Sequence, residues 1–289
     1  MSQLPESTES TDAKQAPEAA LPVVVLKTKS DRRIKQGHCW VYSNEIDIER
    51  SQFKTFAAGQ QATLVNPHGL VLGSGYFNPQ ALLCGRLYSR DDQQPLDSAF
   101  IRRQVTVAYA WRQACYQQPY YRLVYGDGDN LPGLVIDRYG DVLVMQINTA
   151  GMMAVLEAIV SSLVDVLKPS GIVLRNEKEN TIEQLPAQTE VVYGEVPDFV
   201  EIIENGVAFN VPVMGGQKTG WFYDHRDSRA LLAKYCQGKR VLDVYSYLGG
   251  WGLQAMASGA ESVTFIDSSA SALAQAEASA TTAGYDTQM

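Results

Sequence analysis

Two carboxylates near the C-terminal end of the chain are placed to hold a nucleoside ligand. Asp243 lies in the apolar segment Arg240–Val244, and Asp267 directly follows the apolar segment Ser262–Ile266. Both segments are typical of buried strands, and the glycine-bearing stretch Tyr245–Gly250 joins the first of them to a predicted helix. Ligands of open α/β sheets bind beyond the carboxyl ends of strands, so we expect both acids at such a site. An acid after the second strand suits the two hydroxyls of an adenosine ribose.

The glycine spacing separates three classes of nucleotide ligand. A dinucleotide site needs GxGxxG, which Gly249, Gly250 and Gly252 do not form, and Asp243 would repel a pyrophosphate. A P-loop is excluded because the chain has no GxxxxGK[ST]. S-adenosylmethionine carries no phosphate, and its sulfonium and ammonium groups tolerate a nearby carboxylate. The pattern therefore favours S-adenosylmethionine over a glycine-capped turn without a ligand.

A second block of polar and aromatic residues precedes the first acid. The stretch Gly215–Arg226, GGQKTGWFYDHR, alternates glycine, polar and aromatic residues before a predicted helix. Read alone it is a loop with a capped helix, in which His225 fits a helix-surface residue better than a general base. Because the loop leads into the strand that carries Asp243, we expect it to form a wall of the same pocket.

One stretch of this acidic chain is basic. The net charge is −8, but residues 22–95 hold nine basic and six acidic residues. Five of the basic residues lie within residues 27–35: Lys27, Lys29, Arg32, Arg33 and Lys35. Asp31 is the only acidic residue in this stretch. Such a run is either a solvated loop or a patch that contacts phosphates. The overall charge does not exclude a nucleic acid, because binding depends on the local field of one face.

The elements that must position these residues fall into four segments. We predict a disordered tail over residues 1–21, a small β-barrel or sheet over 22–95, a central α+β domain over 96–195 and a parallel α/β sheet over 196–289. Strands of the second segment are expected at Val23–Lys27, Gln60–Val65, Leu70–Tyr76 and Leu82–Ser89. The third is expected to contain helices at Asp97–Gln117 and Met152–Leu167 and strands at Arg122–Tyr125, Gly133–Asp137, Val142–Asn148, Ile172–Arg175 and Glu190–Tyr193. The fourth should hold a hairpin at 199–213, strands at Arg240–Val244 and Ser262–Asp267, and helices at Phe222–Cys236, Trp251–Ser258 and Ala270–Ala283.

Several classes of protein are excluded by composition. The 289 residues contain no apolar run of about 18, so no membrane span is expected. The start of the chain lacks a secretory signal. The four cysteines form no CxxC pair and the three histidines no HxxxH, so neither a disulfide framework nor a metal site is expected. An EF-hand at Asp127–Asn130 fails because Leu131-Pro132 occupies ligand positions. These observations favour a soluble cytoplasmic protein.

Four blocks of sequence together resemble one known family. GQKTGWFYDHR followed by VLDVYSYLGGWG is similar to the bacterial PUA-domain-containing, S-adenosylmethionine-dependent 23S rRNA cytosine-5 methyltransferases, with His225 where glutamine is usual. Residues 29–42 resemble the opening of that family's PUA domain, and residues 73–79, GSGYFNP, its second PUA signature. Residues 126–140 resemble its central-domain signature, with GDGDN in place of a more usual GExDG.

The resemblance implies a cofactor site and an RNA-binding site. The expected cofactor-binding residues are Gln217, Lys218, Thr219, Phe222, Asp224, Arg226, Asp243, Tyr245, Ser246, Tyr247, Gly249, Gly250 and Asp267. The expected residues for binding large-subunit ribosomal RNA through the PUA-like domain are Lys29, Arg32, Arg33, Lys35, His38 and Trp40. For Trp40, core packing is an equal alternative. The sequence leaves the oligomeric state, including a homodimer, open.

The family's catalytic parts have no counterpart in this sequence. The resemblance implies a cysteine thiolate that adds to C6 of cytosine, yet the chain has neither the DPPxF loop nor the C-terminal cysteine motif. We therefore expect no catalytic residue in this chain, an incomplete methyltransferase sheet with one edge of Arg240–Val244 unpaired, and no methyl transfer by the chain alone. Two interpretations stay open, a methyltransferase cut short and a non-catalytic RNA-binding protein.

Overall fold

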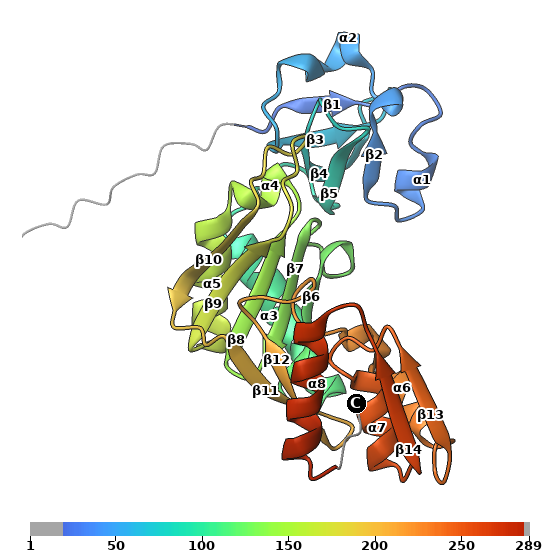
Figure 1. The fold of residues 1–289 in the computed structure, drawn as a ribbon. Helices are drawn as coiled ribbons and strands as arrows, with labels where there is room; N and C mark the ends of the chain where they lie inside the picture. Colours follow the sequence, from blue (N-terminus) through green and yellow to red (C-terminus); the bar gives the residue numbers. More distant parts are fainter. Residues whose placement is uncertain (1–19, 286–289) are drawn as a thin grey trace, which may run out of the picture.

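The computed structural model describes residues 20–285. Most of the expected disordered tail, residues 1–19, lies outside the described residues. Three units follow one another along the chain and are stacked from top to bottom in Figure 1, in blue to teal, in green to yellow, and in golden orange to red. No helix in the described range is long and apolar enough to cross a membrane.

The first unit is a five-stranded sheet with its own core. In spatial order the strands are β1 (Val23–Val25), β3 (Gln60–Val65), β4 (Val71–Phe77), β5 (Leu83–Ser89) and β2 (Trp40–Tyr42). Four short helical segments belong to the same unit: α1 (Arg32–Lys35), η1 (Ser43–Glu45), α2 (Ile48–Ser51) and η2 (Phe53–Thr55). β1 runs parallel to β3, and the other neighbours are antiparallel. The expected strands are present, whereas β2, only three residues long, was not predicted.

The second unit is a five-stranded mixed sheet with helices on one face. Its strands, in spatial order, are β10 (Gln188–Gly194), β9 (Gly171–Asn176), β8 (Val142–Ile147), β7 (Leu134–Tyr139) and β6 (Tyr120–Tyr125). The helices are α3 (Ser98–Cys115), α4 (Ala150–Met153), α5 (Leu156–Leu167) and the 3₁₀ turn η3 (Gly126–Asp129). Asp97 caps α3 by accepting a hydrogen bond from the N–H of Phe100 at 2.7 Å. The single helix expected at Met152–Leu167 is wrong, because the chain leaves helical geometry at Val155, which precedes α5.

The third unit begins with a hairpin and ends in a two-stranded parallel sheet. The hairpin is β11 (Phe199–Glu204) and β12 (Val207–Pro212), and its turn residues Asn205 and Gly206 have φ of 53° and 84°. The rest is η4 (Tyr223–His225), α6 (Arg226–Ala233), β13 (Arg240–Val244), α7 (Gly250–Ala257), β14 (Ser262–Ile266) and α8 (Ala270–Thr282). The predicted strand–helix–strand–helix order is confirmed. The helix expected at Phe222–Cys236 is shorter, a 3₁₀ turn followed by α6.

The two faces of the central sheet belong to different cores. Alternate residues such as Met145 and Leu174 pack under α3 and α5, whereas Val144 and Val173 pack against the hairpin and the third unit. In the third unit, Phe265 of β14 is buried, while Leu242, Val244 and Ile266 are 61%, 46% and 49% exposed. Among residues 20–285, β13 has no strand partner other than β14. The second face of the central sheet is the one that positions the site.

Candidate functional site

A strained loop links β13 to α7. Tyr245, Tyr247 and Gly249 have φ of 61°, 49° and 72°, in the left-handed region. A Cβ on Gly249 would approach Ala276 to 3.0 Å, so only glycine fits there without rearrangement. Two non-glycine residues in this conformation within three positions mark a loop held by its surroundings, which is common at ligand sites.

The two acids predicted from the sequence lie on either side of this loop. Asp243 is 8% exposed, and its Oδ2 accepts the N–H of Gly252 at 2.9 Å. Burial raises the pKa of Asp243, and the Gly252 N–H and the charge of Arg229 act in the opposite direction. Asp267 accepts the N–H groups of Tyr247 and Ser269, each at 2.8 Å. Asp243 thus braces the start of α7, and Asp267 fixes the loop.

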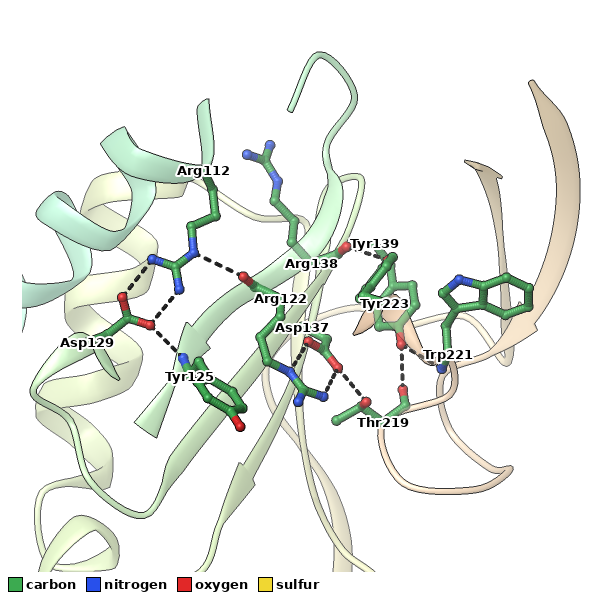
Figure 2. Close-up of polar contacts among 10 residues, drawn as sticks. All are labelled: Arg112, Arg122, Tyr125, Asp129, Asp137, Arg138, Tyr139, Thr219, Trp221 and Tyr223. Atoms are coloured by element: carbon green, nitrogen blue, oxygen red, sulfur yellow. Dashed lines mark hydrogen bonds and ion pairs between the residues drawn. The ribbon is translucent and has the colours of Figure 1, made fainter. Parts of the chain in front are cut away.

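The central sheet holds the second loop, residues 213–223, in place. Thr219, fully buried, donates its hydroxyl hydrogen bond to Asp137, as Figure 2 shows. Asp137 also accepts from Nε and Nη2 of Arg122 at 2.9 and 3.0 Å. The hydroxyl of Tyr139 donates to the Thr219 carbonyl at 3.0 Å and accepts from the Trp221 N–H at 2.9 Å. Both sides of the loop at Gly220 are therefore anchored to strand β7.

Tyr247 ties the two loops together. Its hydroxyl accepts the N–H of Gln217 at 3.2 Å and donates to the carbonyl of Gly220 at 3.0 Å. Its backbone N–H is held by Asp267, as above. Phe222 meets the Tyr247 ring edge to face, with centroids 5.7 Å apart. One tyrosine therefore sets the distance between the GQKTG loop and the loop after β13.

A pocket of about 330 Å³ lies between the two loops. Two buried polar atoms in its lining have no hydrogen-bond partner among the described residues: Oγ of Ser246, 3% exposed, and Nε of Arg229, 4% exposed. A buried donor without a partner is costly, so such atoms indicate a ligand position. A Cβ on Gly250 would lie 3.0 Å from Nε of Arg229, which explains glycine at this place. Two free donors and the carboxylate of Asp267 in one pocket lining fit S-adenosylmethionine, which offers a carboxylate and a ribose.

The predicted cofactor residues separate into two groups. Those that line this pocket are Gln217, Phe222, Tyr245, Ser246, Tyr247, Gly250 and Asp267. The others lie around it and do not line it: Lys218, Thr219, Asp224, Arg226, Asp243 and Gly249. Lys218 lies over the Phe222 ring at 5.0 Å, and Asp224 is exposed. Nη2 of Arg226, in the third unit, donates a hydrogen bond to the carbonyl of Tyr120, in the central unit, and so joins these two units.

Sequence reasoning missed an ion-pair network under the pocket. Glu204, 1% exposed, accepts from Nη1 of Arg229 at 2.5 Å, Nε1 of Trp221 at 2.9 Å and Nε2 of Gln254 at 3.0 Å. The Arg229 guanidinium also lies 4.5 Å from the Trp221 ring centroid. Glu204 ends a hairpin strand, so nothing in its local pattern indicates this role. The second arginine of HRDSR, three residues after Arg226, was the available signal.

The predicted RNA-binding cations differ in whether they already form an ion pair within the protein. Arg33 pairs with Glu45 at 2.8 Å, and Lys35 pairs with Asp31 at 2.6 Å. Lys29, Arg32 and His38 are exposed and form no ion pair within residues 20–285. These exposed side chains remain the predicted contacts to phosphate.

Trp40 lies at the junction of the first two units. Its indole Nε1 donates to Oδ2 of Asp127 at 2.7 Å, and the residue is 38% exposed. Nearby, the Tyr76 hydroxyl, from the GSGYFNP block, donates to the Pro132 carbonyl and lies 2.9 Å from Oγ1 of Thr149. These signature residues therefore join the units, which is a structural role for Trp40 beside the predicted RNA contact.

None of the four cysteines lines the pocket. Cys84 is buried in the core of the first unit, and burial raises its pKa to about 12. Burial also raises the pKa of Cys39, and the charge of Asp127 adds to this effect. Cys115 ends α3, and Cys236 packs in the core of the third unit. Within residues 20–285, no group of three or more His, Cys, Asp or Glu residues is placed to hold a metal ion.

Comparisons with known proteins agree with this arrangement. Residues 24–90 match the PUA-like domain family, and residues 181–288 match a family of S-adenosylmethionine-dependent methyltransferases. The chain is 34% identical over 268 residues to the ribosomal RNA large subunit methyltransferase I of Aliivibrio fischeri, covering 91% of this chain and 67% of that protein. It is 33% identical to the protein of the same name from Tolumonas auensis, covering 89% and 66%. The chain thus spans about two thirds of the length of these relatives.

Solved structures share the fold over nearly the whole chain. A protein from Streptococcus mutans assigned to the SAM-dependent methyltransferases superposes with a TM-score of 0.78 at 23% identity, covering 93% of this chain and 69% of that one. A second structure, assigned as a methyltransferase and complexed with SAH, gives a TM-score of 0.79 at 23% identity, covering 93% and 68%. The expected fold class, a PUA-like β-rich unit followed by an α/β methyltransferase unit, is confirmed.

Proposed function

The chain belongs to the family of the ribosomal RNA large subunit methyltransferase I proteins. We propose that it binds S-adenosylmethionine and takes part in the methylation of large-subunit ribosomal RNA. The observation that carries this proposal is the pocket between residues 217–229 and 245–251, whose lining combines Asp267 with the two unpartnered donors of Ser246 and Arg229. The relatives' name and the match of residues 181–288 to the methyltransferase family support it.

The residues of the pocket have distinct roles in this proposal. Asp267 accepts from the ribose hydroxyls, and Ser246 with Arg229 donates to the carboxylate of the amino-acid end. Asp243, buried behind the loop, favours the cationic end of the cofactor electrostatically. S-adenosylmethionine itself supplies the electrophilic methyl group. Phe222 and Tyr247 exclude water from the pocket and hold its two walls together.

We propose carbon 5 of cytosine as the acceptor, on the resemblance of the GQKTG and VLDVYSYLGGWG blocks. In that chemistry a thiolate adds to C6, C5 then attacks the methyl group, a base removes the C5 proton, and the thiolate leaves. The cysteines of this chain do not suit the nucleophile, because none lines the pocket and burial raises the pKa of Cys39 and Cys84, which opposes the thiolate form. We therefore propose that this chain alone binds cofactor and does not transfer methyl groups.

Two assays test the proposal together. Calorimetry with S-adenosylhomocysteine should show binding to the 289-residue chain. Incubation of the same chain with large-subunit ribosomal RNA and methyl-labelled S-adenosylmethionine should leave the RNA unlabelled. Label at carbon 5 of cytosine would contradict the inactivity of the chain, and label at another atom would contradict the cytosine-5 assignment.

A second candidate function is RNA binding without catalysis. The observation that favours it is the same absence of a thiol from the pocket lining, together with the exposed cations Lys29 and Arg32 of the PUA-like unit. A chain that binds RNA but shows no heat of binding with S-adenosylhomocysteine would support this candidate over the first.

A further inference from the structure

A second polar cavity lies in the central sheet, apart from the cofactor pocket. It has a volume of about 200 Å³ and lies at the carboxyl ends of the parallel strands β8 and β9. Its polar lining consists of the carboxamides Gln146, Asn148, Asn176 and Asn180 and the charged residues Arg175, Glu177 and Lys178. Four of the seven are carboxamides, a concentration that neither the cofactor site nor the cores account for.

One of these carboxamides has a buried donor without a partner. Asn176 is 7% exposed, and its Oδ1 accepts the N–H of Ile147 at 3.1 Å. Its Nδ2 is buried and has no hydrogen-bond partner among residues 20–285. Leaving a buried amide donor unsatisfied costs about 1–3 kcal/mol, so a fold keeps one where a ligand or a solvent molecule satisfies it.

The neighbouring carboxamides are also available. Gln146 and Asn148 form no side-chain hydrogen bond within the described part of the chain, and Gln146 is only partly exposed. Asn180 uses its Oδ1 to accept the N–H of Glu183 at 3.2 Å. Each carboxamide offers both donors and an acceptor, so the cavity wall can complement a ring edge that carries both kinds of group.

Arg175 connects the cavity to the loop of the cofactor site. Its side chain is 2% exposed, and Nη2 donates to the carbonyl of Gly216 at 2.6 Å. Gly216 directly precedes Gln217, which lines the cofactor pocket. Burial lowers the pKa of Arg175, and Glu177, 3.2 Å from Nη2, acts in the opposite direction. A ligand in the cavity would thus lie next to the side chain that holds the cofactor loop.

The size and chemistry of the cavity limit its ligand. Its volume is several times the about 30 Å³ share of one water molecule and below the about 300 Å³ of the smallest drug-sized sites. Unpaired RNA bases are read through hydrogen bonds to their edges, for which carboxamides are suited, and Lys178 adds a cation for the adjoining phosphate. We propose that this cavity binds one unpaired base of an RNA substrate. This inference rests on the proposed function, in which the chain acts on ribosomal RNA.

Binding of short single-stranded RNAs tests the inference. Fluorescence anisotropy with labelled U10, C10 and A10 is compared for the unchanged chain, the Gln146→Ala/Asn148→Ala double variant and Asn176→Asp. The first variant removes two carboxamides that have no structural hydrogen bonds. The second keeps the acceptor for the Ile147 N–H and replaces the free donor by an acceptor. Gln113→Ala, an exposed glutamine on α3, is the matched control.

The expected result is a preference of the unchanged chain for one oligomer by at least about threefold. The double variant should lower the affinity for that oligomer about tenfold, as expected for two lost hydrogen bonds, and remove the preference. Asn176→Asp should change which oligomer is preferred, and Gln113→Ala should change nothing. Affinities unchanged in both cavity variants, equal affinities for all three oligomers, or no RNA binding would overturn the inference.

The outcome separates this inference from the proposed function. Cofactor binding is measured on the same variants with S-adenosylhomocysteine. Retained binding of both RNA and S-adenosylhomocysteine without any effect of the cavity variants would refute the base site alone. If the unchanged chain binds neither RNA nor S-adenosylhomocysteine, the proposed function is refuted as well.

Discussion

The hydroxyl of Thr219 donates a hydrogen bond to the carboxylate of Asp137, and both side chains are fully buried. Thr219 belongs to the loop that walls the cofactor pocket, and Asp137 belongs to strand β7 of the central sheet. Because Arg122 holds Asp137 with two further hydrogen bonds, the carboxylate is a fixed acceptor (Figure 2). The central unit therefore acts as the scaffold of the cofactor loop.

Removing this hydrogen bond should weaken both stability and cofactor binding. Thr219→Val keeps the shape of the side chain and removes the donor to Asp137. A hydrogen bond to a charged group contributes about 1.5–3 kcal/mol, so the free energy of unfolding should fall by about that amount. The affinity for S-adenosylhomocysteine should fall severalfold, because the loop loses one of its anchors to strand β7, while those made by Tyr139 and Tyr247 remain. Urea unfolding and calorimetry measure the two effects.

Thr106→Val is the matched control for that substitution. Thr106 lies on the exposed surface of α3, and its hydroxyl bonds to the Arg102 carbonyl at 2.8 Å. Its loss should leave cofactor affinity unchanged. Equal affinities for Thr219→Val and the unchanged chain would show that the central unit does not position the loop.

Gly252 should tolerate no side chain, in contrast to Gly215. A Cβ on Gly252 would lie 2.2 Å from Cε1 of Phe265, whereas one on Gly215 meets nothing within 4 Å. Overpacking of a core typically costs about 1–3 kcal/mol, so Gly252→Ala should lower the midpoint of urea unfolding and Gly215→Ala should not. Equal midpoints for the two variants would argue against the close contact between Gly252 of α7 and Phe265 of β14.

The pH dependence of stability should reveal the buried Asp243. Burial, the main cause, raises its folded pKa above the ordinary value of 3.8. A carboxyl that ionises less readily in the folded than in the unfolded chain contributes stability that is fully present below 3.8 and is lost as the pH rises through the folded pKa. Asp243→Asn keeps an acceptor for the Gly252 N–H and cannot ionise.

The stability of Asp243→Asn relative to the unchanged chain should therefore increase between about pH 3 and pH 7. Urea unfolding at a series of pH values measures this difference directly. A difference that is constant with pH, or one that decreases as the pH rises, would contradict a raised pKa of Asp243.

The free and the paired cations of the first unit should contribute unequally to RNA binding. Lys29 and Arg32 form no ion pair in the described structure, whereas Arg33 and Lys35 pair with Glu45 and Asp31. Lys29→Ala/Arg32→Ala and Arg33→Ala/Lys35→Ala change the charge equally. The logarithm of the RNA association constant falls linearly with the logarithm of the salt concentration, and each contact with a single-stranded phosphate contributes about 0.7 to the steepness of this line. Only the first variant should therefore make the line less steep, by about 1.4. Equal slopes for both variants would mean that an ion pair within the protein does not prevent a cation from contacting RNA phosphates.

Local patterns predicted most elements because hydrophobic period and turn residues are local signals. β13, bounded by Arg240 and Val244, was predicted to the residue, and the hairpin expected at 199–213 is present, with its turn at Asn205-Gly206. The break at Val155 was missed because the apolar period continues across it. The three residues of β2 were missed because so short a strand shows no alternation.

The site was predictable where one segment carries it. Ser246, Tyr247 and Asp267 were predicted to lie together and do, because they follow two adjacent parallel strands. The roles of Asp137 and Glu204 depend on contacts with residues 82 and 25 positions away, which no local pattern reveals. For the same reason Thr219 was predicted as a cofactor contact, whereas its hydroxyl is used by Asp137.

Calorimetric titration of S-adenosylhomocysteine into the chain tests the central claim most directly. The unchanged chain should bind one equivalent, and Asp267→Asn, which removes one carboxylate oxygen from the pocket rim, should bind at least about tenfold more weakly. Asp165→Asn, on the exposed face of α5, should bind like the unchanged chain. No binding to the unchanged chain, or equal affinities for all three proteins, would contradict the assignment of this pocket to S-adenosylmethionine.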